Sequence, residues 1–110
     1  MRNNVYYILQ TPPNSDNNYM PLDMRQSLDR HDYCYIWYDN IPSSVSFENE
    51  SSVYNFLEEL FEEFNLRHPD HFAGHSLSVG DLIQLNLNGT SKTYFCDSIG
   101  FVDVTERLAK

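Results

Sequence analysis

The chain has 110 residues, 15% of them aromatic, and its 16 acidic residues outnumber the 7 basic ones to give a formal net charge of −9. This length predicts one domain over residues 1–110. The charge argues against direct nucleic-acid binding, because contacts to phosphates need lysine and arginine. No apolar stretch reaches the roughly 18 residues of a membrane span, and no apolar signal segment follows the N-terminus. We therefore expect a cytoplasmic protein that makes no use of a membrane.

Two strands are predicted in the N-terminal half. Residues 5–9 form a short β-branched and aromatic run, which ends at a loop of prolines and asparagines over residues 11–18. Residues 20–30 are ambiguous and have room for one helical turn after Pro21. Residues 33–38 form an apolar run without a polar face, which predicts a strand at the centre of a sheet or covered on both sides.

Residues 51–65 carry the clearest periodicity in the sequence. Apolar side chains recur at i, i+3, i+4, i+7, i+8 and i+11, which makes one stripe along an amphipathic helix. Ser51 or Ser52 can cap the N-terminus of this helix, and Pro69 prevents it from continuing past His68. The stripe consists of Val53, Phe56, Leu57, Leu60, Phe61 and Phe64.

The C-terminal part of the chain predicts a β-meander. Ile83, Leu85 and Leu87 alternate with polar residues, as in a strand with one buried face. Asn88-Gly89 tolerates the positive φ angles of a tight hairpin turn. Residues 94–96 then supply the return strand and residues 100–102 a third one. The expected fold is α+β, with one main amphipathic helix packed on a mostly antiparallel sheet that ends in this meander.

A set of short motifs is spread over most of the chain and is densest between residues 60 and 104. The motifs are Met20-Pro21-Leu22, Phe64-Asn65, His68-Pro69, the run from Gly74 to Asp81, Asn88-Gly89, Tyr94-Phe95, Asp97-Ser98 and Gly100-Phe101. Together they resemble the YodL-like domain family. The resemblance implies a single YodL-like domain from the mobile elements and plasmids of Gram-positive bacteria, some of whose proteins are described as antirestriction factors. It implies no catalytic residue.

The negative charge is concentrated between residues 39 and 70. Eight acids lie there against Arg67 alone, so this stretch carries −7 of the formal −9. On the predicted helix, like charges four residues apart, such as Glu58 and Glu62, cost a few tenths of a kcal/mol. No lysine offsets this cost, which indicates that the acidic face has a use; the alternative is a face that keeps a small protein soluble. The eight acids are Asp39, Glu48, Glu50, Glu58, Glu59, Glu62, Glu63 and Asp70.

The histidines and serines around residue 75 do not form the pattern of a metal or catalytic site. His68, His71 and His75 cannot share a helix face across Pro69, so we expect neither a metal nor a cofactor. A Ser-His-Asp triad is not expected either, because the Gly-x-Ser-x-Gly elbow is missing. Instead, Ser78 and Asp81 are predicted to shape the turn before the strand through side-chain-to-backbone hydrogen bonds.

The cysteines and tyrosines are also predicted to have structural or interface roles. Cys34 and Cys96 are expected to be small buried residues rather than nucleophiles or disulfide partners, since a reactive thiolate needs an electropositive pocket. The tyrosines lack the neighbouring basic residues of a base-stacking surface and are expected in the core or at a protein interface. No feature indicates an enzyme.

These observations predict an acidic, non-enzymatic inhibitor of a basic nucleic-acid-handling defence protein. The CRISPR nuclease Cas9 is the first candidate target and a restriction enzyme the second. Carboxylates standing in for phosphates would block the guide- or DNA-binding surface. The alternative is a small regulatory or scaffold module of a mobile element with no nuclease target. The predicted partner-binding residues are Glu48, Glu50, Glu58, Glu59, Glu62, Glu63 and Asp70.

Overall fold

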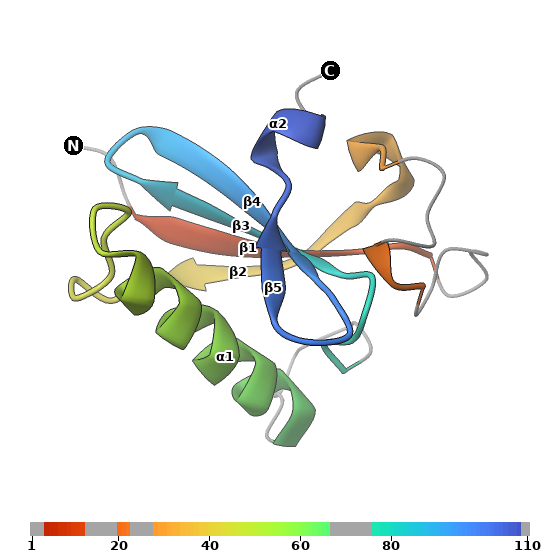
Figure 1. The fold of residues 1–110 in the computed structure, drawn as a ribbon, viewed down its shortest axis with the longest axis horizontal. Helices are drawn as coiled ribbons and strands as arrows, with labels where there is room; N and C mark the ends of the chain where they lie inside the picture. Colours follow the sequence, from red (N-terminus) through yellow and green to blue (C-terminus); the bar gives the residue numbers. More distant parts are fainter. Residues whose placement is uncertain (1–3, 13–19, 23–27, 67–75, 109–110) are drawn as a thin grey trace.

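The computed structural model describes residues 4–12, 20–22, 28–66 and 76–108. Its elements in chain order are β1 (Val5–Gln10), the 3-10 turn η2 (Arg30–Asp32), β2 (Cys34–Asn40), α1 (Glu50–Leu66), β3 (Leu82–Leu87), β4 (Thr90–Cys96), β5 (Phe101–Asp103) and α2 (Thr105–Leu108). The strands form one antiparallel sheet in the order β2-β1-β3-β4-β5, and α1 lies along one side of it (Figure 1). This confirms the predicted α+β fold with its C-terminal meander.

The main core lies between α1 and the sheet. Leu57 and Phe64 of the helix are fully buried, and they belong to one apolar cluster with Ile8, Ile83 and Leu85 from β1 and β3. Each fully buried side chain of this kind contributes about 1.5–3 kcal/mol of transfer free energy. The apolar stripe of the helix therefore fixes which side of α1 faces the sheet.

A second, smaller cluster lies on the opposite face of the sheet. Strand side chains alternate between the two faces, so neighbours of the core residues point to this side. The cluster is partly covered by Leu28 and by Leu108 of α2. As a result, β3 is buried on both faces for most of its length. The buried members of the cluster are Leu9, Tyr33, Leu82, Phe95 and Val104.

Strand β2 lies at an edge of the sheet, so its predicted central or covered position is wrong. It pairs with β1, and no other described strand pairs with it. Tyr35 and Tyr38 are 54% and 69% exposed, while Trp37 packs edge-to-face on Phe64 at 6.0 Å between ring centroids. An aromatic run fits an edge because tyrosine and tryptophan rings can cover the sheet while their polar groups reach hydrogen-bond partners or water.

Helix α1 begins at Glu50, one residue before the predicted start, and its cap is Asn49 rather than Ser51 or Ser52. The Asn49 side-chain oxygen accepts a hydrogen bond from the Ser52 amide at 3.3 Å, which is the bond a capping residue provides. The Ser52 hydroxyl instead donates to the Asn49 carbonyl at 2.7 Å. Both serines thus lie inside the first turn.

The predicted hairpin turn is confirmed by the backbone angles. Asn88 and Gly89 have φ values of 51° and 85°, as a tight turn between two antiparallel strands requires. Gly100, with φ of 71°, makes the next reversal and leads into β5. Among the described residues, no helix is long and apolar enough to cross a membrane.

Phe61, which the spacing places in the middle of the apolar stripe, lies instead at its margin. Its exposed fraction is 36%, against 4% for the neighbouring Leu60. Leu60→Ala is therefore expected to lower the free energy of unfolding by about 2–5 kcal/mol, and Phe61→Ala by about 1 kcal/mol. Urea denaturation of both variants measures these values. Equal losses in the two variants would contradict the packing described.

Candidate protein-binding site

The outer face of α1 carries four exposed glutamates, Glu58, Glu59, Glu62 and Glu63. Their side chains are exposed because the apolar stripe occupies the side of α1 that packs on the sheet. The ion pair found in the described part of the chain joins His31 to Asp29 at 2.9 Å, and none there involves a carboxylate of α1. The structure therefore brings these four predicted residues together on one face of α1, without a basic partner among the described residues. This surface is hereafter the acidic face.

The other three predicted partner-binding residues, Glu48, Glu50 and Asp70, are not part of the acidic face as described. Glu48 and Glu50 are exposed at the N-terminal end of α1, and Glu50 lies about 12 Å along the axis from Glu58 at a rise of ~1.5 Å per residue. A carboxylate in the first turn also stabilises the helix dipole, which gives Glu50 a structural role. Asp70 lies outside the described residues, as do His68, His71 and His75.

One flank of the acidic face borders β1 and β2. Burial is the main reason that the pKa of the Tyr6 hydroxyl is raised to about 12, and the charges of Glu63 and Asp39 add to it. The Tyr6 hydroxyl accepts a hydrogen bond from the indole N–H of Trp37 at 3.3 Å. This flank is thus acidic on its surface and aromatic beneath.

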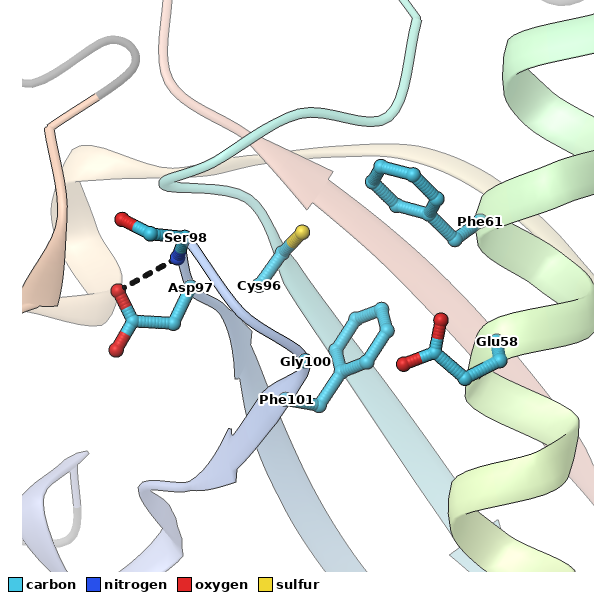
Figure 2. A pocket seen from close by; sticks show the side chains of 7 residues that line it. All are labelled: Glu58, Phe61, Cys96, Asp97, Ser98, Gly100 and Phe101. Carbon is cyan, nitrogen blue, oxygen red and sulfur yellow. Dashed lines mark hydrogen bonds between the residues drawn. The ribbon is translucent and has the colours of Figure 1, made fainter.

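The other flank borders a hollow of about 120 Å³ between α1 and the turn that joins β4 to β5 (Figure 2). Sequence reasoning did not identify this pocket, because its residues come from segments far apart in the chain. Residues 97, 98, 100 and 101 of the pocket belong to motifs of the family resemblance, and this is the only sequence pattern that pointed to them. The lining residues are Glu58, Phe61, Cys96, Asp97, Ser98, Gly100 and Phe101.

Burial disfavours the charged form of the Cys96 thiol in this pocket. It raises the pKa of the thiol to about 12, and nearby carboxylates, Asp81 and Glu58 first among them, add to the shift. The thiol is therefore neutral near pH 7, the form that is the weaker nucleophile. This confirms the predicted buried position of Cys96, whereas Cys34 is exposed and its predicted burial is wrong because β2 is an edge strand.

Asp97 has a structural task at the rim of the pocket. Its Oδ1 accepts hydrogen bonds from the amides of Ser98 at 2.9 Å and Leu22 at 3.2 Å. These bonds shape the β4–β5 turn and tie it to the segment that precedes η2. Figure 2 shows the carboxylate of Glu58 on the opposite side, beside Phe101. Glu58 is thus the acid that remains available inside the hollow.

The turn before β3 confirms the predicted roles of Ser78 and Asp81. Asp81 is buried, and its Oδ2 accepts hydrogen bonds from the Ser78 amide at 2.9 Å and from the Gln10 side chain at 3.0 Å. The link to Gln10, at the end of β1, was not predicted. Asp81 thereby holds together two segments separated by 71 positions in the chain.

The tyrosines of β1 and β2 form a second exposed surface, hereafter the tyrosine surface. The rings of Tyr7 and Tyr35 meet edge-to-face at 5.4 Å, and Tyr38 lies 6.1 Å from Tyr7. The Tyr35 hydroxyl donates to the side-chain oxygen of Gln84 at 3.1 Å. This uncharged aromatic patch lies on the opposite face of the sheet from α1.

Within the described ranges, no group of three potential metal ligands occurs.

Alkaline pH is expected to destabilise the protein through Cys96. The folded-state pKa is about 12, above the ordinary value of 9.0, so folding favours the neutral thiol. This contribution is fully present below about pH 9 and is lost as the pH rises toward about 12. Urea unfolding at about pH 8 and about pH 10.5 should show a smaller loss for Cys96→Ser than for the wild type. An equal loss in both proteins would contradict the assignment.

The comparisons with known proteins agree with the motif pattern. No curated protein and no solved structure gives a significant match. A family model for the YodL-like domain matches residues 5–106, nearly the whole chain. The chain belongs to the YodL-like domain family.

Proposed function

We propose that this protein is a non-enzymatic inhibitor that binds a basic, nucleic-acid-handling defence protein. The acidic face would occupy the surface that the guide or the DNA otherwise uses. The observation that carries the proposal is the set of four exposed glutamates without a basic partner among the described residues. Cas9 is the first candidate target and a restriction enzyme the second.

The geometry of the acidic face supports this mode of binding. Glu58 and Glu62 lie about 6 Å apart along the helix axis, as do Glu59 and Glu63, at ~1.5 Å per residue. Such rows of negative charge offer lysine and arginine the partners that phosphates provide in nucleic acid. They also attract a basic partner before contact and so raise the association rate.

A binding role also fits the chemistry of the described residues. General acids and bases need an environment that tunes their pKa, and the glutamates of α1 are exposed. Cys96 is held as a neutral thiol. Membership of the YodL-like family supports the mobile-element setting that the sequence resemblance implies. A cytoplasmic location follows for an inhibitor whose targets act on nucleic acid inside the cell.

The tyrosine surface favours the alternative, a small regulatory or scaffold module with no nuclease target. Tyr35 and Tyr38 are strongly exposed and uncharged, and tyrosine is frequent at the centres of protein interfaces. A partner bound there would depend on aromatic packing and not on charge. The two functions therefore differ in which surface is buried and in their response to salt.

Charge reversal on the acidic face tests the proposal. The pair Glu59→Lys and Glu62→Lys is expected to weaken inhibition of Cas9 cleavage at least about tenfold, or about 1.4 kcal/mol of binding free energy. The fold should persist, because both side chains are exposed. The matched control reverses Asp32 and Glu106, exposed acids outside α1, and changes the net charge equally. Unchanged inhibition by the first pair, or equal loss in both pairs, would sink the proposal.

Salt dependence separates the two surfaces. If the acidic face steers association, the association rate constant should fall steeply from low salt to about 0.15 M, where screening shortens the range of charges to ~8 Å. Stopped-flow mixing at several ionic strengths measures this constant. A rate constant independent of salt would point to the tyrosine surface instead.

A further inference from the structure

The pocket beside α1 combines one carboxylate with two aromatic rings. The rings of Phe61 and Phe101 lie 6.4 Å apart with an interplanar angle of 82°. Figure 2 shows the carboxylate of Glu58 next to Phe101, facing the turn at Gly100. A Cβ at Gly100 would lie 4.0 Å from the Glu58 carboxylate, an ordinary van der Waals distance, so the turn passes close beside that oxygen.

The backbone conformation at Gly100 favours glycine. Gly100 has φ of 71°, a left-handed conformation that other residues adopt at a cost of about 1 kcal/mol or more. The glycine therefore lets the β4–β5 turn reverse the chain beside Glu58. Since Cys96 in the wall is a neutral thiol, Glu58 is the charge that a ligand would meet first.

Several ligand classes do not suit this lining. An anion would be repelled by Glu58 and Asp97. A divalent metal needs several oxygen ligands, but Asp97 is engaged by two backbone amides, and the described residues hold no cluster of metal ligands. A wholly apolar ligand would remove water from Glu58 without replacing its hydrogen bonds. A cation with a flat apolar face meets all these conditions.

We infer that this pocket binds the guanidinium group of an arginine side chain from a protein partner. Its N–H groups would donate to the carboxylate of Glu58 while its plane lies against Phe101 or Phe61. A guanidinium suits the site better than an ammonium because it is planar, stacks on rings and is less strongly hydrated. A cavity of about 150 Å³ holds a benzene molecule, so about 120 Å³ fits a smaller planar group.

This inference rests on the proposed function and adds an anchor to it. The glutamates of the acidic face attract a basic partner from a distance but define no single contact. Glu58 differs from them because it faces a hollow with aromatic walls. Arginine is among the residues that carry most of the binding energy when they enter such pockets. One helix would thus provide both the charges that attract the partner from a distance and the carboxylate, Glu58, that binds one of its side chains.

The test uses the folded protein of residues 1–110 and needs no nuclease. Amide NMR spectra are recorded while N-acetyl-arginine amide is added to about 50 mM, with N-acetyl-lysine amide and N-acetyl-glutamine amide as parallel probes. The expected result is a saturable shift of the Cys96, Gly100 and Phe101 amides with the arginine probe, at a dissociation constant of millimolar order. The lysine probe should bind more weakly, and the glutamine probe should give no saturable shift.

Matched variants locate the interaction. Glu58→Gln should lose at least about tenfold in affinity for the arginine probe, and Phe101→Leu should weaken it. Glu106→Gln, an exposed acid of α2 outside the acidic face and the pocket lining, should bind as the wild type does. Failure to saturate, equal binding of the lysine probe, or equal losses in Glu58→Gln and Glu106→Gln would overturn the inference. Arginine binding without inhibition of Cas9 would contradict the proposed function alone.

Discussion

The packing of the apolar stripe of α1 on one face of the sheet determines how the rest of the surface is arranged. Leu57 and Phe64 are fully buried against the strands, and rotating the helix would expose them at a cost of several kcal/mol. The four glutamates are therefore held on the exposed side of the helix, with Glu58 at the margin beside the pocket. The same orientation places Glu58 and Phe61 at the helix margin, where the β4–β5 turn closes the pocket.

A small set of buried polar contacts supports this arrangement at the end of the sheet. Asp81 accepts hydrogen bonds from Ser78 and Gln10, and its carbonyl oxygen accepts one from the Cys96 amide at 2.8 Å. A buried carboxylate needs such partners, since an unsatisfied one would be strongly destabilising. These contacts give Asp81 of the Gly80-Asp81 pair a structural role.

Local patterns in the sequence predicted the parts of the fold that depend on near neighbours. The spacing of apolar residues gave α1 to within one residue at each end, because helical packing depends on residues three and four apart. Asn88-Gly89 predicted the hairpin, and Ser78 with Asp81 predicted the turn before β3. Each of these contacts spans only a few residues of chain.

Predictions of features that depend on residues far apart in the chain were wrong, or the features were not predicted at all. The aromatic run of β2 is compatible with a strand at the centre of a sheet and with one at its edge. Its sequence does not decide between them, because strand order depends on pairing between distant segments. Phe61 fits the stripe by spacing alone, yet it lies at the margin. The pocket joins Glu58 to the segment that begins at Cys96, and no local pattern connects these two parts of the chain.

The acidic face and the pocket give the proposed inhibitor two separable properties. In this proposal, the charge of the acidic face would attract a basic protein, and Glu58, Phe61 and Phe101 would bind one of its arginine side chains. The tyrosine surface lies on the other side of the sheet and would serve a different partner. The central claim is therefore one of location, namely that the nuclease covers the outer side of α1.

Hydrogen–deuterium exchange of this protein with and without Cas9, free or loaded with guide RNA, tests that location most directly. The account predicts slower exchange in α1 and in the β4–β5 turn with the free nuclease, a weaker effect once guide RNA fills the basic surface, and no change in β2. Slower exchange confined to β2, or the absence of any change with free and loaded nuclease, would contradict it.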